Sequence, residues 1–260
     1  MRNHQISSNA PNLRFPRPSV PGWFLWVPAT AAILAPQALT AQSRNADEGT
    51  LRIRVGATDV AREEFSILRG GSTTGGGGFR ILATAFYPPR RTRVTMTDSV
   101  LLGPDSLPRL ADFLPAQPNG VRTVTQFGPR ILTLRRMEPG GESFREYPGV
   151  DRNWVVDDSM ATLYAVPPGT HDGPVRLVSR QGERSDFQLT NLGIQQTDVA
   201  GRQRELLHLV LTRGDDTRHL WYEGEELQEG LIEVVRLMKV EIPARRLVAE
   251  RILESTLPNR

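Results

Sequence analysis

Most of the chain alternates between apolar and polar residues with a period of two, which is the pattern of half-buried β-strands. The clearest example is the segment 51–55, which reads Leu-Arg-Ile-Arg-Val. Glycine and proline turns separate the alternating segments. The pattern predicts about a dozen strands joined as sequential hairpins, over residues 51–55, 60–68, 79–87, 92–102, 121–127, 130–137, 142–147, 175–180, 185–192, 204–212, 217–223, 232–242 and 247–253.

Two long stretches lack this alternation. Residues 70–78 are glycine-rich and predict a flexible connection. A phosphate-binding loop would need a Lys-Ser or Lys-Thr pair opening a helix, and this stretch has none. Residues 104–120 are punctuated by proline, so we predict a crossing loop there.

Residues 153–168 show the period of a helix instead. Met160, Leu163 and Tyr164 fall at positions i, i+3 and i+4, which is one helical face. Asp157 is a suitable N-cap, and two prolines at 167–168 end the segment. A helix this short is unstable alone in water, so it must pack against the strands. We therefore predict a short helix over residues 157–166 that fills the inside of the sheet.

A sheet of this many strands curls, and wrapping it around the helix would cover the apolar faces of both. The predicted fold is mainly β: a large curved antiparallel sheet, a half-barrel or open barrel, wrapped around one short helix. With Gly214-Asp215 as a hairpin loop, paired residues have numbers that sum to 429. Candidates for lining a ligand cavity on the concave face are Trp154, Met160, Leu163, Tyr164, Leu207, Leu209, Leu211, Leu220, Tyr222, Arg236 and Met238.

Arg236 is unusual among these candidates, because it interrupts the apolar side of the segment 232–242. Two interpretations stay open from the sequence. It is either a buried arginine with an acidic partner or a residue that lines the cavity, since a buried charge needs a partner.

The N-terminus predicts export. Residues 1–41 hold three arginines, no acidic residue and an apolar run at 22–35, the layout of a signal peptide cleaved after Ala41 or Thr40. A membrane anchor is the alternative, but the run is broken by Pro28 and is shorter than the ~20 residues that span a bilayer. We expect residues 42–50 to be a disordered mature N-terminus, residues 51–254 a single half-barrel domain, and residues 255–260 a polar tail.

The charge and the cysteine content exclude several classes of function. Without residues 1–41 the chain has 29 basic and 29 acidic residues, and the arginines alternate with acidic residues along the strands. Binding to nucleic acid needs clustered positive charge, so no nucleic-acid partner is expected. The chain has no cysteine, which excludes disulfides, thiol nucleophiles and a lipidated cysteine. We expect no transmembrane anchor after cleavage.

Candidate catalytic and metal-binding residues are few. His208 and His219 would be diagonal neighbours across a hairpin, within reach of a shared metal ion. A zinc site needs three or four ligands, so the favoured interpretation is a pair of polar residues on the outer face. No Gly-x-Ser-x-Gly motif is present. The strand arginines are expected to pair across strands with Glu63, Glu142 and Glu146 on a solvated face.

The C-terminal third carries a pattern that resembles a known family. Trp221-Tyr222, the segment RLMKVEIPA at 236–244 and the segment VAER at 248–251, together with Trp154 ahead of Asp157, are similar to a family of uncharacterised exported bacterial proteins. That family resembles the half-barrel of the outer-membrane lipoprotein carriers, in which a curved sheet encloses a helix and an apolar cavity. The resemblance implies export and fold, and lipid handling only by analogy.

These observations lead to three hypotheses about function. The first is an exported, noncatalytic envelope protein that binds a lipid or other lipophilic molecule in its concave face. The alternative is an envelope scaffold or protein-binding module with a filled interior. The third, least favoured, is a hydrolase with an unrecognised site, since no catalytic motif is present. No cofactor is expected, and the site of action is the periplasm or the extracellular space.

Overall fold

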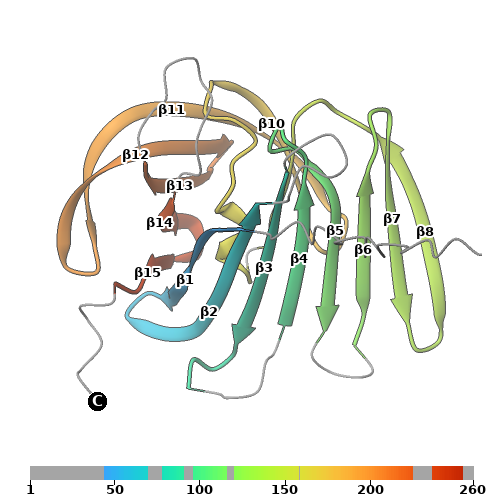
Figure 1. The fold of residues 1–260 in the computed structure, drawn as a ribbon, viewed down its shortest axis with the longest axis horizontal. Helices are drawn as coiled ribbons and strands as arrows, with labels where there is room; N and C mark the ends of the chain where they lie inside the picture. The colour runs from blue at the N-terminus through green and yellow to red at the C-terminus, as the bar shows by residue number, and fades with distance from the viewer. Residues whose placement is uncertain are drawn as a thin grey trace, which may run out of the picture. The chain divides into compact units, whose positions relative to one another are not determined.

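The structure is a computed structural model that describes residues 44–69, 78–90, 96–115, 120–157, 159–224 and 236–253 (Figure 1). All of these residues belong to one compact unit, Thr40–Arg260. The predicted signal peptide at 1–41 and the polar tail at 255–260 lie outside the described residues. In the described part of the chain, no helix is long and apolar enough to cross a membrane.

The described residues form one 15-stranded sheet in the order β8-β7-β6-β5-β4-β3-β2-β1-β15-β14-β13-β12-β11-β10-β9. Neighbouring strands are antiparallel, except that β9 runs parallel to β10. The sheet is open, because β8 and β9 end the order and do not pair with each other. The prediction of a mainly β protein built on one large antiparallel sheet is therefore confirmed.

The sheet has two arms that meet where β1 pairs with β15. The first arm contains β1 (Arg44–Val55), β2 (Thr58–Arg69), β3 (Phe79–Phe86), β4 (Met96–Leu102), β5 (Pro108–Pro115), β6 (Arg122–Phe127), β7 (Ile131–Glu138) and β8 (Gly141–Pro148). The second arm contains β9 (Asn153–Val155), β10 (Gly173–Val178), β11 (Arg184–Val199), β12 (Arg202–Arg213), β13 (Asp216–Glu223), β14 (Arg236–Ile242) and β15 (Leu247–Arg251). Apart from the parallel pair of β9 and β10, each arm is a series of antiparallel neighbours, as the alternation predicted.

Two segments expected to be irregular are strands. Residues 44–49, expected to be disordered, extend β1 and pair with the C-terminal half of β2. The expected crossing loop at 104–120 contains β5, whose Ala111 and Phe113 face the core while Leu110 and Leu114 are exposed. Because β5 carries apolar residues on both faces, it shows no period of two, and the alternation could not reveal it.

The predicted helix over 157–166 is wrong in length and type. The structure has a 3₁₀ helix, η1, at Ala161–Tyr164, and a second, η2, at Pro243–Arg245. Met160 occupies the N-cap position of η1, with no side-chain cap, and Asp157 does not cap it. The residues just before it extend β9 instead, where Val156 donates a backbone hydrogen bond to the Val178 carbonyl. Asp157 then forms an antiparallel bridge with Met160, whose backbone N–H donates to the Asp157 carbonyl at 2.8 Å, so the helical segment begins only at Ala161.

The buried segment 160–165, which contains η1, is called the plug below. Strands β1, β2, β3 and β14 all contact η1, although they come from both arms of the sheet. Strand β9 also contacts β5, which stands far from it in the strand order. The sheet is therefore curved around the plug, which lies between the strands of the two arms in Figure 1.

Candidate functional site

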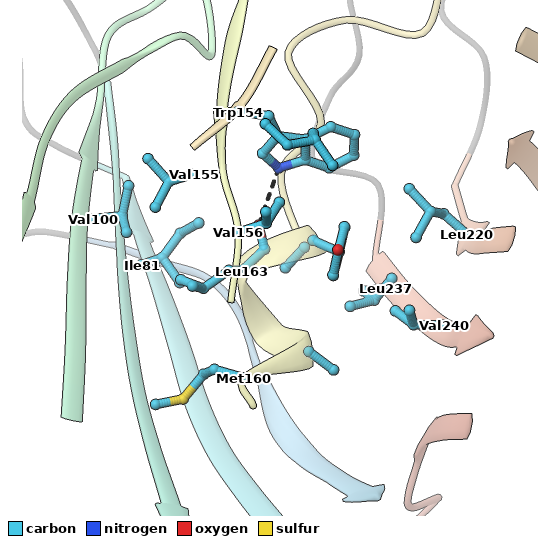
Figure 2. Close-up of a cluster of buried hydrophobic side chains, with 14 of the residues drawn as sticks. Ile81, Val100, Trp154, Val155, Val156, Met160, Leu163, Leu220, Leu237 and Val240 are labelled. Carbon is cyan, nitrogen blue, oxygen red and sulfur yellow. Dashed lines mark hydrogen bonds between the residues drawn. The ribbon is translucent and has the colours of Figure 1, made fainter. Parts of the chain in front are cut away.

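Nine of the eleven residues proposed to line the concave face belong to one buried core around the plug. They are Trp154, Met160, Leu163, Tyr164, Leu207, Leu209, Leu211, Leu220 and Tyr222. The hairpin register is also confirmed, because Leu207 pairs with Tyr222 and Leu209 with Leu220. Figure 2 shows plug and strand side chains converging on this core.

The other two candidates do not line the core. Met238 packs on the opposite face of the sheet with Val199, Leu206 and Trp221. A β-bulge between β13 and β14 pairs Tyr222 with Leu237, which reverses the alternation and turns Leu237 inward in place of Met238. Proposing Met238 as a cavity residue was therefore wrong.

Arg236 is neither a buried arginine nor a lining residue of the core. Its side chain is 53% exposed and forms ion pairs with Asp47 and Glu223, each at 3.4 Å. It lines a surface hollow of about 730 Å³ together with Arg62 and Arg251. Both interpretations left open by the sequence are thus excluded, because the side chain reaches the surface.

The strands hold the plug by side-chain hydrogen bonds as well as by apolar packing. The Trp154 indole Nε1 donates to the Leu163 carbonyl at 3.1 Å, the dashed line in Figure 2. The Tyr222 hydroxyl donates to the Tyr164 carbonyl at 2.7 Å. Arg218 donates to the Tyr164 hydroxyl. These bonds satisfy plug groups that lie away from water, where an unpaired polar group is costly.

Glu63 is the most buried acidic group at the plug. It is 0% exposed and occupies a core-facing position of β2, between Ala61 and Phe65. Its carboxylate accepts the backbone N–H groups of Ala161 and Thr162, both at 2.8 Å, and the Thr162 hydroxyl at 2.7 Å. Glu63 therefore satisfies the first free N–H groups of η1, which lacks a side-chain cap. Its expected role in a solvated ion pair was wrong.

A second buried carboxylate lies two strands away on the same face of the sheet. Asp98 on β4 is 0% exposed and accepts a hydrogen bond from Arg180 at 2.6 Å. Arg180 also donates to Asp157 at 2.7 Å, and its guanidinium lies 5.1 Å from the centre of the Phe113 ring. Arg180 thus joins the first arm of the sheet to the residues that precede the plug. Among the residues that the structure describes, none forms a hydrogen bond with the other oxygen of Asp98, Oδ2.

Burial raises the pKa of both carboxyl groups. Desolvation is the main cause of the rise in the pKa of Glu63 to about 7, against the lowering effect of its hydrogen bonds to Thr162 and Ala161. Desolvation likewise raises the pKa of Asp98 to about 7, although Arg180 opposes the rise. The nearby Tyr87 hydroxyl, which donates to the Ser159 carbonyl, also has a raised pKa, chiefly through burial.

A carboxyl group with a pKa near 7 has the proton affinity of a general acid or base. The geometry around these two groups opposes such a role. Both oxygens of Glu63 are occupied by the plug, and neither Glu63 nor Asp98 is accessible to a substrate. The cluster of Glu63, Asp98, Asp157 and Arg180 is therefore an anchor for the plug.

A pattern in the sequence could have placed both carboxylates on the core face of the sheet. Glu63 follows Ala61 and precedes Phe65 and Ile67 at intervals of two, and Asp98 stands at the same interval from Val100. Position alone places both carboxylates on the apolar face of their strands. The charged residues on either side, Arg62 and Glu64, obscured that position.

A hollow of about 410 Å³ opens beside the anchor. Its lining includes Asp157, Ser159, Ser185, Arg213 and Arg218 over a floor of Phe187. None of the eleven predicted cavity residues lines it. This hollow is polar in character, unlike the apolar cavity that a lipid would need.

The predicted histidine pair does come together, on the face of the sheet opposite the plug. His208 Nε2 lies 3.0 Å from His219 Nδ1. The His208 ring also stacks on Trp221, and burial lowers its pKa to about 4. Within the described ranges, no three His, Cys, Asp or Glu residues are grouped to hold a metal ion.

Comparisons with known proteins show no family for this chain. No protein-family model matches the chain. No curated protein sequence matches it either. Among solved structures, a chain described as a beta-barrel-like protein of domain of unknown function DUF1849 from Brucella abortus is similar, with a TM-score of 0.42 and 9% sequence identity. The match covers 80% of this chain and 98% of that one.

Proposed function

We propose that this chain is an exported, noncatalytic protein of the cell envelope that binds another protein through the outside of its sheet. The observation that carries the proposal is the plug. Met160, Leu163 and Tyr164 are buried at the centre of the core, and strands of both arms bond to the plug. A protein whose interior is filled by its own chain offers its outer surfaces for binding.

The outer face of β4 to β8 has the composition of a binding surface. Five large apolar side chains among the described residues are exposed on this face, and two of them, Leu101 and Leu110, are direct neighbours across β4 and β5. The five are Leu101, Leu110, Leu114, Ile131 and Phe144. Strand β8 ends the sheet and is exposed on both faces, so its free backbone groups are open to an added strand.

The proposed partner is an envelope protein that offers an extended apolar segment to the β8 edge. Backbone hydrogen bonds would supply affinity in this mode, and side chains such as Phe144, which is 59% exposed, would supply specificity. The proposal of export rests on the layout of residues 1–41. N-terminal sequencing of the mature protein tests it directly, because it shows whether this segment is removed.

A photo-crosslinking amino acid at position 144 tests the binding surface in cells that make the full chain. We expect a discrete adduct from position 144 and none from position 192, where Leu192 is also exposed but on β11. The captured protein, once purified, should bind the wild-type chain but not the Phe144→Asp variant. Equal adducts at both positions, or binding unaffected by Phe144→Asp, would refute the proposal.

The second candidate function is the binding of a lipophilic ligand in the space that the plug fills. Its support is that the strands already surround an apolar segment that is short and 3₁₀-helical rather than a long stable helix. Solvent extraction and mass spectrometry of protein purified from cells, with uptake of a fluorescent fatty acid, test it. A stoichiometric lipid would favour this function over the first, and its absence with no uptake would remove it.

A further inference from the structure

The outer face of β12 and β13 carries two histidine rings that converge on one point. His208 Nε2 and His219 Nδ1 lie 3.0 Å apart, and the ring centres are 5.2 Å apart. The residues are diagonal neighbours in the hairpin, since His208 pairs with Trp221 and His219 with Val210. Two side chains from adjacent strands therefore hold ring nitrogen atoms within hydrogen-bond distance of each other.

The His208 ring is held in place by two further contacts. Its Nδ1 lies 2.8 Å from the side-chain oxygen of Gln195, which accepts the proton on that nitrogen. The ring also stacks on the Trp221 indole, with centroids 3.6 Å apart and planes inclined by 9°. A hydrogen bond at one ring nitrogen leaves the other with its lone pair. The lone pair on Nε2 is therefore directed at His219.

The nitrogen separation suits two ligands of one metal ion. Metal–nitrogen bonds of about 2.0–2.1 Å at tetrahedral or right angles place two nitrogens about 2.8–3.4 Å apart. The separation of 3.0 Å lies in that range. Metal-binding histidines also donate their other N–H group to an oxygen acceptor, as His208 does to Gln195.

An acidic side chain stands next to the pair. Glu241 on β14 is directly opposite His219 in the register, and its side chain is 31% exposed. It forms an ion pair with Lys239 at 2.7 Å and so does not point at the two nitrogens. Water would fill the other coordination positions of the ion. Glu241 would lie on the strand next to that of His219.

We propose that His208 and His219 form a binding site for one divalent transition-metal ion of the class that prefers imidazole, namely Cu²⁺, Ni²⁺ or Zn²⁺. Two neutral imidazoles suit these ions better than Mg²⁺ or Ca²⁺, which prefer oxygen. Cu²⁺ binds most tightly in this series and is the probe of choice. The site is separate from the plug and from the proposed partner surface.

Titration of the full chain with CuCl₂ tests the site by electron paramagnetic resonance and calorimetry. We expect one equivalent of Cu²⁺ to bind with hyperfine structure from two nitrogens, and thermal stability to rise with bound ion. His219→Gln should weaken binding by more than about tenfold, and Gln195→Ala by about tenfold through loss of ring orientation. Mg²⁺ should not compete.

Two controls keep the test decisive. His171→Gln removes an exposed histidine elsewhere and should leave the site intact. His208→Gln should abolish the two-nitrogen signal, and circular dichroism establishes whether that variant is folded. If it is not, His219→Gln decides alone, because His219 is only half-buried. Unchanged affinity in His219→Gln, or no Cu²⁺ binding by the wild type, would mean that the pair is a hydrogen bond only.

Discussion

The carboxylate of Glu63 accepts two hydrogen bonds from Thr162, one from its backbone N–H group and one from its hydroxyl, across 99 residues of sequence. This relationship joins strand β2 to the first turn of the plug. Removing one partner of a buried hydrogen bond leaves the other unsatisfied, which costs about 1–3 kcal/mol for each group. Glu63 therefore ties β2 to the plug by three side-chain hydrogen bonds.

Glu63→Ala should destabilise the protein strongly. It leaves three buried donors, those of Ala161 and Thr162, without an acceptor. We expect the free energy of unfolding in urea to fall by about 3 kcal/mol or more. Glu64→Ala is the matched control, because Glu64 is exposed and forms a surface ion pair with Arg62, and it should cost under about 0.5 kcal/mol. Equal effects would show that Glu63 does not anchor the plug.

Stability should fall as the pH rises from about 5 to 8. The folded pKa values of Glu63 and Asp98, both about 7, lie above the ordinary values of 4.5 and 3.8. Between those limits the folded state holds more protons than the unfolded state. Each group then contributes stability that is complete below its ordinary pKa and is lost as the pH rises through 7. The slope is up to about 1.4 kcal/mol per pH unit for each group.

Urea denaturation at a series of pH values measures this slope. The double variant Glu63→Gln, Asp98→Asn removes both titrating carboxyl groups and should abolish the fall between pH 5 and 8. Its stability should instead rise with pH up to about 6.5, because burial lowers the pKa of His208 to about 4. Below that window, carboxylates with lowered pKa values such as Glu142 and Asp186, held by arginine partners, act in the opposite direction. A wild-type profile that is flat or rises with pH in the window would contradict the prediction.

Tyr222→Phe should cost about 1 kcal/mol of stability. The change keeps the ring in the core and removes the hydroxyl that donates to the Tyr164 carbonyl. Thermal unfolding followed by circular dichroism measures the effect. Tyr147→Phe is the control, since Tyr147 is only partly buried against the core. A loss no greater than that of the control would mean that this bond does not hold the plug.

Several features could be predicted from the sequence because they depend on local pattern. The register of the β12–β13 hairpin follows from its turn residues, and the inward face of Leu207 and Leu209 follows from the register. Met238 could not be placed correctly, because a β-bulge adds one residue to a strand and so shifts the face of the residues beyond it. The alternation of apolar and polar residues does not show where such a bulge occurs. The role of Glu63 depends on a partner 99 residues away, which no local pattern shows.

The start of β1, residues 44–49, was predicted from the sequence to be disordered, and its place in the sheet can be tested. Asp47 and Arg251 form a buried ion pair with two hydrogen bonds, at 2.7 and 2.8 Å, that ties β1 to β15. Asp47→Ala should cost about 3–5 kcal/mol, because the buried Arg251 guanidinium loses its carboxylate and keeps, among the described residues, only neutral backbone acceptors, the carbonyls of Glu48 and Leu237. Asp105→Ala, which breaks the exposed pair with Arg109, should cost at most about 1 kcal/mol.

Urea unfolding of both variants gives the comparison. The double variant Asp47→Leu, Arg251→Met should recover much of the loss, since apolar replacement of a buried pair is often neutral. If Asp47→Ala costs no more than Asp105→Ala, then residues 44–49 are not held in the sheet.

The most direct test of the sheltered plug uses the absence of cysteine from the chain. A single cysteine at position 160 or 159 reports its own exposure through its rate of reaction with a thiol reagent. Met160 is fully buried and Ser159 is exposed, although the two are adjacent. We predict that Ser159→Cys reacts at the rate of a free thiol while Met160→Cys reacts only after urea unfolds the protein. Equal rates in the folded protein would contradict the account.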